Sequence, residues 1–491
     1  MMEPTNSLVI CSDQHNKFIT GCYGSEFVQT PNLDRLAQLG TRFNSAYTPS
    51  PICMPARAAL ATGRYCHEIG AWGNGSPYTG THADTGAAIP TWGHRLTEQG
   101  FDAVTVGKLH FHPDVESGYD ERIPLHATLA KDGYGPAIWG WMRGDMPPSE
   151  KLRKEVESAH VGEFGYTRYD RQIAQTAASW IEDEVSRDKP WSAFISFTYP
   201  HYPFVVPQSY VDLYDPDSLP LPPNWQEEDW SPHPALRWKM NIHAFDRGFT
   251  EAQLRKVIAI YYGMVTFMDE QVGIVLDALE RSGQWDNTRI LYTSDHGEML
   301  GEQGFFFKGL MHESSAGIPM IMAGPDVPEA HICHTPVNLI DVYPTVIETV
   351  GAALTEEDST LHGRSLIDIA NEPDDKERVT LSEYHSVASQ SGTYMVRCGY
   401  YKYVHYLGQD AQLFDLSADP HEANNLAGGA PMQELREDYE AKLRAILDPE
   451  AVDAQARAFQ QAELAKFGDL AQMKKFEGNR PYSAPPEQFG Q

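Results

Sequence analysis

The chain has 491 residues, of which 41% are hydrophobic and 11% aromatic. This length and composition exclude a coiled coil, a collagen-like fibre and a wholly disordered chain, and they predict a large domain accompanied by a smaller one. The 38 basic and 68 acidic side chains give a formal net charge of −30. A surface this acidic argues against nucleic acid and anionic membranes as partners, because both are bound through basic patches.

The N-terminal sequence MMEPTNSLVICSDQ lacks a basic segment followed by an apolar one. No run of about 18 apolar residues, the length that spans a membrane, occurs along the chain. We therefore expect a cytoplasmic protein. Six cysteines in so long a chain do not form a disulfide framework, so we expect reduced thiols.

Predicted strands and helices alternate through about residue 350. Short apolar runs predict strands at Ser7–Cys11, Arg42–Tyr47, Phe101–Val106, Ser192–Thr198, Arg289–Thr293 and Pro319–Met322. Amphipathic or proline-initiated stretches predict helices at Asn32–Leu39, Pro55–Thr62, Thr91–Gln99, Tyr169–Val185 and Glu251–Arg281. This alternation predicts an α/β fold, with a large, mostly parallel sheet flanked by helices on both faces.

The pattern changes after about residue 375. Four short strands are predicted close together, at Thr380–Tyr384, Tyr394–Cys398, Tyr401–Tyr406 and Gln412–Asp415. They indicate a small antiparallel sheet, which is followed by helices from Met432 to Phe467 and an extended polar tail from Gly478. We expect a large α/β domain over residues 1–375 and a C-terminal lobe over residues 376–491.

Polar side chains follow four of the predicted strands. They are Asp13 after the first, Lys108 and His110 after another, His201 after a third, and Asp295 and His296 after a fourth. Ligands of open α/β sheets bind beyond the carboxyl ends of the strands. We therefore expect these side chains to form a single site.

The strongest local signal is Cys53-Met54-Pro55-Ala56-Arg57, which continues as Ala-Ala-Leu-Ala-Thr-Gly-Arg to Arg64. Pro55 favours the start of a helix and so places Cys53 at a helix N-terminus, where free N–H groups favour an anion. Arg57 lies one turn further along, on the same face. A nucleophile with a cation one turn behind it suits attack on a tetrahedral oxyanion.

This C-x-P-x-R element resembles the maturation motif of the type I sulfatases, in the alkaline phosphatase superfamily. In that family the cysteine is converted to formylglycine, and the hydrated aldehyde is the nucleophile. The resemblance covers nearly the whole chain, up to an L-F-D-L…D-P-x-E…N-L segment between Leu413 and Leu426. It implies an alkaline phosphatase-like fold, sulfuric ester hydrolase activity, and a formylglycine-generating enzyme as the maturation partner.

The resemblance also implies a metal site. The family holds its metal with two pairs, here Asp13-Gln14 and Asp295-His296, and with the formylglycine oxygen at Cys53. Oxygen ligands favour Ca²⁺, whereas the imidazole makes Mn²⁺ or Zn²⁺ an alternative. Gln14 and His296 replace the Asp and Asn of many sulfatases, and in this they resemble the branch of choline sulfatases and phosphonate monoester hydrolases.

Five further positions match residues that surround the sulfuryl group in this family. Lys108 and His110 resemble the Lys-x-His pair that binds a sulfate oxygen and assists proton transfer. His201 follows a proline after a central strand and is the candidate general acid for the leaving oxygen. Lys308 matches a lysine after the late metal pair, and Asn74 matches an asparagine after the nucleophile helix.

The resemblance implies that residue 53 attacks sulfur, that His201 protonates the departing alcohol, and that a base such as His110 then helps to expel sulfate. A phosphonate monoester or phosphodiester hydrolase is the first alternative, because the same groups suit either tetrahedral centre. A non-catalytic anion-binding protein with an unmodified Cys53 is the second.

Four aromatic side chains lie near the motifs, namely Trp72, Trp139, Trp141 and Tyr202. They suit a cation–π box for a quaternary ammonium group, although packing in the core or loops explains them at least as well. Choline-O-sulfate is therefore one hypothesis for the substrate. The helical C-terminus and polar tail favour a homo-oligomer.

Overall fold

The computed structural model describes residues 3–75, 78–82, 86–127, 142–144, 146–185, 188–469, 472 and 483–490. Trp139 and Trp141, two of the aromatic candidates, lie outside the described residues, as do residues 478–482 of the predicted tail. Among the described residues, no helix combines the length and apolar character that a membrane crossing requires.

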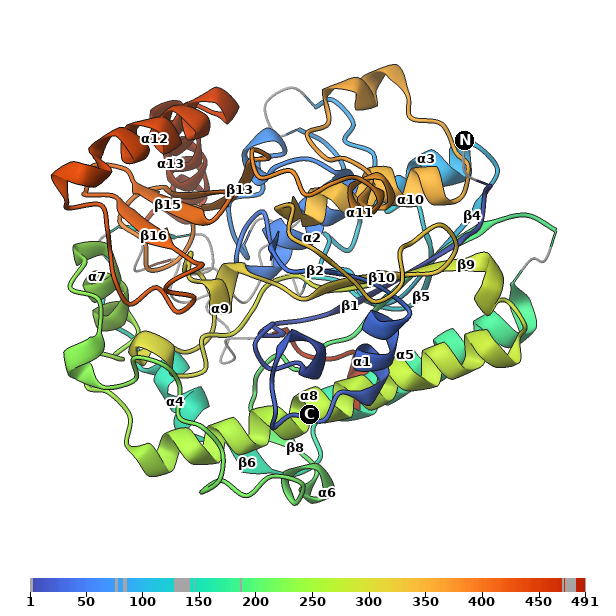
Figure 1. Cartoon of the computed structure of the whole chain (residues 1–491), viewed down its shortest axis with the longest axis horizontal. Coiled ribbons are helices and arrows are strands. Elements are labelled where there is room, and N and C mark those ends of the chain that lie inside the picture. Colours follow the sequence, from blue (N-terminus) through green and yellow to red (C-terminus); the bar gives the residue numbers. More distant parts are fainter. Residues whose placement is uncertain are drawn as a thin grey trace.

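An eight-stranded sheet forms the centre of the molecule (Figure 1). Its strands, in spatial order, are β11 (His331–Cys333), β2 (Gly40–Phe43), β10 (Met320–Ala323), β9 (Thr288–Ser294), β1 (Asn6–Ser12), β7 (Trp191–Ser196), β4 (Asp102–Lys108) and β5 (Asp120–Leu125). All neighbouring pairs are parallel except the two that involve β10. The predicted large, mostly parallel sheet is confirmed.

Helices cover both faces of this sheet (Figure 1). One face carries α1 (Pro31–Gln38), α5 (Gly165–Ser179) and α8 (Glu251–Arg281), and the other carries α2 (Cys53–Thr62), α3 (Trp92–Glu98), α10 (Val342–Thr349) and α11 (Leu366–Asn371). Successive residues of β1 supply both cores: Leu8 and Ile10 pack on the first face, and Val9 and Cys11 on the second. Burial on both sides explains why β1 is an unbroken apolar run.

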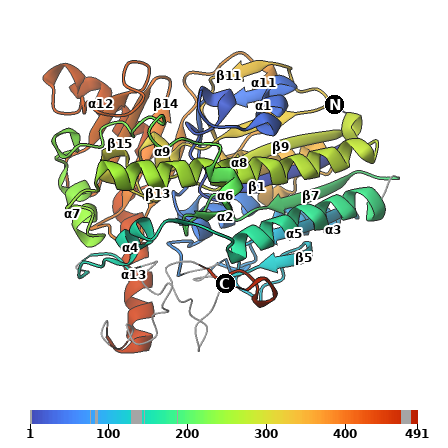
Figure 2. The same ribbon diagram turned by 90° about the horizontal axis from the view of Figure 1, so that it is seen from below.

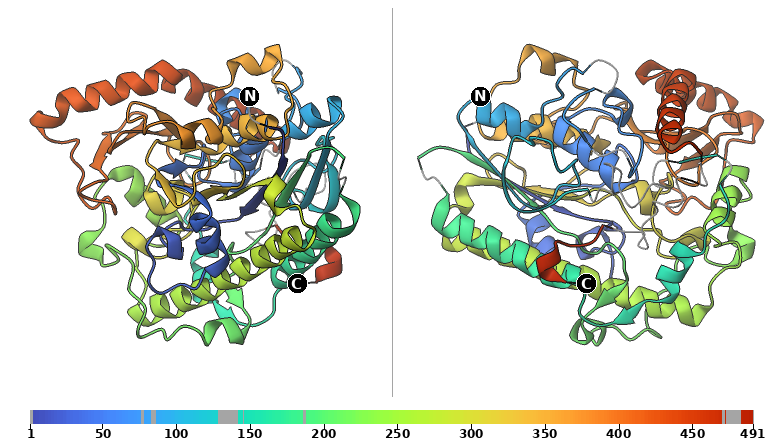
Figure 3. Two further views of the ribbon diagram at one scale, coloured as in Figure 1. Left: turned by 45° about the vertical axis from the view of Figure 1, so that its right-hand side comes forward. Right: turned by 180° about the vertical axis from the view of Figure 1, so that it is seen from behind.

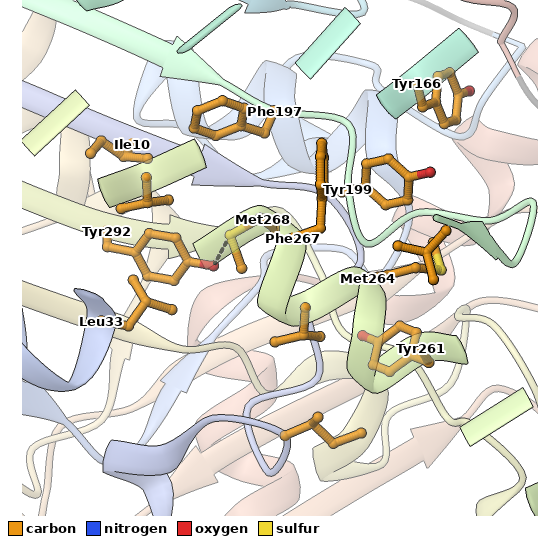
Figure 4. Close-up of a cluster of buried hydrophobic side chains, with 14 of the residues drawn as sticks. Ile10, Leu33, Tyr166, Phe197, Tyr199, Tyr261, Met264, Phe267, Met268 and Tyr292 are labelled. Atoms are coloured by element: carbon orange, nitrogen blue, oxygen red, sulfur yellow. Dashed lines mark hydrogen bonds between the residues drawn. The ribbon is translucent and has the colours of Figure 1, made fainter. Parts of the chain in front are cut away.

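The core under α8 is rich in aromatic and sulfur-containing side chains (Figure 4). Tyr292 of β9 points its hydroxyl at the sulfur of Met268 in α8, 3.4 Å away. Tyr261, from the same helix, donates to the carbonyl of Gln14 at 2.6 Å and accepts from the backbone N–H of Asn16 at 3.0 Å. This core therefore fixes the loop that follows β1.

A second, four-stranded antiparallel sheet contains β13 (Thr380–Tyr384), β14 (Thr393–Cys398), β15 (Tyr401–Tyr406) and β16 (Gln412–Asp415) in that order. The predicted small sheet is confirmed, and each strand pairs with the next one along the chain. Two helices, α12 (Gln433–Ile446) and α13 (Pro449–Phe467), follow it, and Figure 2 shows this assembly at one end of the molecule.

Short elements connect these layers. They are β3 (Ala46–Tyr47), α4 (Lys151–Glu157), β6 (His160–Val161), β8 (Val205–Val206), α6 (Gln208–Val211), α7 (Pro234–Ile242), α9 (Glu313–Ala316) and β12 (Val337–Asn338). The single strand predicted over Arg42–Tyr47 is wrong, since the chain divides into β2 and β3. The reason is that β3 leaves the large sheet and pairs with β12.

The described end of the chain, residues 483–490, returns to α5 rather than extending away (Figure 3). The carbonyl of Phe489 accepts a hydrogen bond from Arg168 Nε at 2.6 Å, and its ring packs 5.0 Å from that of Tyr169. The expectation of an extended tail is therefore wrong for these residues. Apolar contact with α5 anchors them.

Candidate active site

The four strands that carry polar residues at their ends, β1, β4, β7 and β9, are mutually parallel neighbours. Their carboxyl ends therefore lie at one edge of the sheet. Asp13 follows β1, Lys108 ends β4, His201 follows β7 and Asp295 follows β9. The register aligns Ser12 with Ser294, which puts the Asp13 and Asp295 pairs side by side.

Helix α2 delivers Cys53 to this edge as its first residue. The helix has an alanine-rich sequence and is buried along its whole length, so its position is fixed on all sides. The sulfur of Cys53 lies 3.1 Å from His296 Nε2, 3.0 Å from Lys308 Nζ and 3.7 Å from Asp13 Oδ1. The structure thus brings the predicted nucleophile together with residues from three distant segments.

Arg57 lies one turn behind Cys53, as predicted, and its guanidinium group joins the strand ends. Nε donates to Asp295 Oδ2 at 2.8 Å, and Nη2 to Asp13 Oδ2 at 3.1 Å. Nη1 donates to the Lys108 carbonyl at 2.8 Å and to Ser196 Oγ at 2.7 Å. Lys108 Nζ also reaches Asp13 Oδ2, at 2.5 Å. We call Arg57, Asp13, Asp295 and Lys108 the Arg57 cluster.

The side chains of Asp13, Cys53, Asp295 and His296 form a group that can hold a metal ion. Each is buried, and one ligand atom from each lies within 4.8 Å of the others. Two carboxylates and an imidazole are suitable ligands for a divalent cation. The donor set therefore fits the metal that the resemblance implies.

Charged neighbours change the acid–base behaviour of this group. Burial and the Asp13 carboxylate raise the pKa of the Cys53 thiol. Lys308 and His296 are the main groups that outweigh both, so that the net pKa is lower than usual. Burial also opposes ionisation of Asp13, yet Lys108, His201 and Arg57 hold its pKa well below the ordinary value. Both groups are thus stabilised as anions, which is the form that binds a cation or attacks an electrophile.

Gln14 and Lys308 meet beside the nucleophile. Lys308 Nζ donates to Gln14 Oε1 at 2.7 Å as well as to Cys53. The amide nitrogen of Gln14 donates to Glu298, whose other oxygen accepts the backbone N–H groups of Leu300 and Phe307. Sequence reasoning assigned no role to Glu298, although its position three residues after Asp295 was a usable signal.

His110 and His201 are both buried at the site, and the pKa of each is held well below its usual value. Burial is the main cause in both cases, followed by Lys108 for His110 and by Lys308 for His201. His110 Nε2 lies 2.5 Å from Ser483 Oγ in the returning C-terminal segment. Ser483 was missed because it is 373 residues from His110 and no local pattern marks it.

Asn74 Oδ1 accepts the backbone N–H of Met54 at 3.0 Å, so it caps the first turn of α2 next to Cys53. Trp72 is buried, and its ring makes an edge contact with that of His385 at 5.1 Å. Tyr202 stacks on His201 at 4.3 Å, with Lys308 Nζ 5.6 Å from the centre of its ring. Asn74 and Tyr202 thus contact the predicted site directly.

Comparison with known proteins agrees with this geometry. The sulfatase family model matches residues 5–352, and a second model, described as the C-terminal part of N-sulphoglucosamine sulphohydrolase, matches residues 301–448. A choline-sulfatase from Rhizobium meliloti is 34% identical over 93% of this chain and 89% of its own length. Human arylsulfatase K is 27% identical over 94% of this chain and 86% of its own length.

Solved structures share the architecture. Phosphonate monoester hydrolase of Agrobacterium radiobacter superposes with a TM-score of 0.68 at 24% identity, covering 92% of this chain and 96% of its own. A structure described as a "putative sulfatase" from Bacteroides thetaiotaomicron superposes with a TM-score of 0.71 at 23% identity, covering 99% of this chain and 98% of its own. The chain has the alkaline phosphatase-like sulfatase fold and belongs to the sulfatase family. It is a sulfuric ester hydrolase.

Proposed function

We propose that the chain hydrolyses the sulfate ester of a small organic molecule, with formylglycine formed from Cys53 as the nucleophile. The observation that carries this proposal is the convergence on Cys53 Sγ, where His296 and Lys308 lie within 3.1 Å and Asp13 within 3.7 Å. A buried thiol with no catalytic role has no need of so many charged neighbours.

Asp13, Gln14, Asp295 and His296 would hold a divalent cation beside residue 53. Ca²⁺ is the first candidate because three of these side chains offer oxygen, and Mn²⁺ or Zn²⁺ is the alternative because of the imidazole. Such a cation, when bound, supplies charge stabilisation for sulfate oxygens and lowers the pKa of a neighbouring hydroxyl.

The remaining cations act as a clamp for the tetrahedral anion. Lys308 reaches both Cys53 and Gln14, so its ammonium group is close to any sulfate oxygen bound there. Lys108 and Arg57 hold Asp13 from the opposite side, and each of the three guanidinium nitrogens of Arg57 donates to a protein group. We assign Arg57 to positioning the carboxylates and Lys308 to contacting the substrate.

Two histidines handle protons. His201 is neutral in the resting site because its pKa is held well below the usual value. Binding of an anionic ester raises that pKa, so that His201 takes up a proton from solvent and then donates it to the departing alcohol oxygen. We assign His110 the role of the base that accepts a proton from residue 53 when sulfate leaves. Ser483 would fix the orientation of its ring through Nε2.

Choline-O-sulfate is the substrate to test first. The choline-sulfatase of Rhizobium meliloti aligns with 93% of this chain, and a net charge of −30 favours a substrate with a cationic tail. The maturation partner would be a formylglycine-generating enzyme. We further propose that the protein is cytoplasmic, because all six cysteines are unpaired, which suits a reducing compartment. We also propose that it forms a homo-oligomer and that residues 1–375 form its catalytic domain.

A substrate panel tests the proposal. The protein, co-expressed with a formylglycine-generating enzyme, would be assayed with an aryl sulfate, a phenylphosphonate monoester and a phosphodiester, alongside Cys53→Ala. We expect the largest kcat/KM for the sulfate and none in the variant. Preference for the phosphonate or diester would establish the alternative hydrolase, and turnover that survives in Cys53→Ala would refute the nucleophile.

The organic group is tested with a matched pair of substrates. Choline-O-sulfate and 3,3-dimethylbutyl sulfate have the same shape, but only the first carries a positive charge. We expect choline-O-sulfate to be hydrolysed at least about tenfold more efficiently, which corresponds to one desolvated cation–π or ionic contact. Equal efficiencies would discard the choline hypothesis while leaving the sulfatase mechanism intact.

A further inference from the structure

Four charged side chains meet in a second buried group, outside the site described above. They are Lys17 in the loop after β1, Glu313 at the start of α9, Lys402 in β15, and Glu422 beyond β16. Their exposed fractions are 5%, 5%, 0% and 3%. We call these four residues the Glu313 cluster.

Glu313 lies at the centre of this cluster. Its Oε2 pairs with Lys17 Nζ, and its Oε1 lies 3.0 Å from Lys402 Nζ. Lys402 also lies 2.7 Å from Glu422 Oε1, while Glu422 Oε2 accepts the backbone N–H of Glu313 at 2.6 Å. The carboxylate of Glu313 is therefore held by Lys17 and Lys402, and its backbone N–H is held by Glu422.

Helix α9 connects this cluster to the metal site. The carbonyl of Ser315, in α9, accepts the backbone N–H of Gly297 at 2.8 Å. Gly297 follows His296 directly, and its carbonyl lies 3.0 Å from His296 Nδ1. The tautomer and orientation of that imidazole thus depend on the carbonyl of Gly297, a residue whose backbone N–H is held by α9.

Helix α9 and the turn at Gly297 are tightly packed. A Cβ atom at Gly297 would lie 2.1 Å from the carbonyl oxygen of Ser314. On the other side of α9, Ser315 Oγ accepts the N–H of Leu310, two residues after Lys308. Movement of α9 must therefore move the backbone on both sides, at His296 and near Lys308.

We propose that Glu313 is a positioning residue for the metal site, and that Lys402 of the C-terminal sheet and Glu422 of the segment after it stabilise this position. The contacts of Glu313 position α9, α9 holds the backbone N–H of Gly297, and the carbonyl of Gly297 orients His296. This inference rests on the proposed function, since it takes His296 as a metal ligand. Lys17 ties Glu313 to the loop that bears Asp13 and Gln14.

Metal affinity provides the test, because a cluster that served stability alone would not change it in the folded protein. Calorimetric titration with Ca²⁺ and Mn²⁺ would be run on the matured wild type, Glu313→Gln and Lys402→Met at a temperature where all three are folded. We expect affinity to fall about 10- to 100-fold in Glu313→Gln, as for other residues that orient a ligand. Lys402→Met keeps the contact between Lys17 and Glu313, so its metal affinity should fall less. Lys402→Arg restores the positive charge, so its metal affinity should recover most of that loss.

Arg378→Met is the matched control. Arg378 is partly buried and forms an ion pair with the buried Asp341 at 2.6 Å, next to the same small sheet. Its guanidinium hydrogen bonds go to Asp341 and the carbonyl of Pro336, and not to α9 or the metal residues. We expect this variant to lose stability and to keep wild-type metal affinity. The inference is overturned if Glu313→Gln and Lys402→Met both bind metal as the wild type does, with only their melting temperatures lowered.

The same titration separates the two proposals. Wild-type protein that binds neither ion, or an Asp295→Asn variant that binds as well as the wild type, would refute the metal site itself. Binding that depends on Asp295 but is indifferent to Glu313 would refute only the positioning role.

Discussion

The Arg57 cluster and the Glu313 cluster are built from the same materials and do different work. Each is a buried set of carboxylates and cations drawn from segments far apart in the chain. In the Glu313 cluster, each oxygen of the central carboxylate faces its own lysine. In the Arg57 cluster, the cations crowd onto Asp13 Oδ2, while Oδ1 faces Cys53 and His296.

This difference distinguishes a group of residues that can bind a ligand from one that stabilises the fold, such as the Glu313 cluster. A carboxylate whose two oxygens are both matched by cations has satisfied its charge and can only hold segments together. A carboxylate with one oxygen turned toward a thiol and an imidazole still has a ligand atom to offer. Variants in the Arg57 cluster and at Cys53 should therefore abolish chemistry, whereas variants in the Glu313 cluster should first weaken stability and orientation.

The largest effect is expected from Cys53→Ala. Removing a nucleophile that acts together with its neighbours costs on the order of 10⁴-fold or more in kcat. Aryl sulfate turnover measures it. Cys66→Ala is the control, because Cys66 is buried just beyond the same helix but faces the carbonyl of Pro55. Comparable losses in both variants would contradict the assignment of Cys53.

Asp13→Asn should come next, with loss of metal binding and about a 10³-fold drop in kcat, because it removes the charge that the cation and Lys108 share. Calorimetry and turnover together report it. The control is Asp269→Asn, a buried carboxylate that accepts the N–H groups of Asn32 and Leu33 at the start of α1. If Asp269→Asn lowers metal affinity equally, the effect belongs to the fold and not to the site.

In the Glu313 cluster, Lys402→Met should destabilise the protein by about 3 kcal/mol, because it leaves the Glu313 and Glu422 carboxylates close together with one positive charge fewer. The double variant Lys402→Met/Glu422→Gln leaves the neutral Lys17–Glu313 pair and should lose only about 1 kcal/mol. Urea unfolding measures both. Additive losses would show that the cluster is not a coupled network.

A smaller effect is expected from pH. Burial lowers the pKa of His243 to about 3, whereas an unfolded histidine titrates near 6.5. The unfolded state therefore binds more protons below about pH 6.5, and stability falls as the pH falls. Between pH 7 and 5 this one histidine should account for about 2 kcal/mol of lost unfolding free energy. The same drop measured in His243→Gln should be smaller by that amount, and an unchanged drop would contradict it.

His312, the residue before Glu313, allows the same pH test beside the Glu313 cluster. Burial, and then Lys402, lower its pKa to about 4, so that it stays neutral beside the Glu313 cluster. Its contribution has the same sign and acts between about pH 6.5 and 4. His312→Gln should flatten the acid side of the stability curve, and a steeper curve would show that the ring is protonated in the folded protein.

Much of the fold was accessible from the sequence. The four strands of the small sheet are short segments close together in the sequence, and β1 and β9 are each followed directly by an acidic residue. The rule that ligands bind beyond strand ends then gathered Asp13, Lys108, His201 and Asp295 without any pairing information. Local pattern was sufficient where each residue's role depends on the end of its own strand.

The Glu313 cluster could not be predicted in this way. Lys17 and Glu313 are 296 residues apart, and Lys402 is 89 residues from Glu313. Each of these residues, taken alone, has the composition of a solvated surface, because charged side chains are usually exposed. Their burial follows from the docking of the small sheet on α9, which no window of sequence contains. The contact of Ser483 with His110 was hidden for the same reason.

The most direct test of the central claim is the mass of the peptide that contains residue 53, taken from protein co-expressed with a formylglycine-generating enzyme. We predict the mass of an aldehyde in place of the thiol, in a fraction of molecules that rises and falls with aryl sulfatase activity across preparations. An unmodified Cys53 in protein that turns over sulfate esters at full rate would contradict the account.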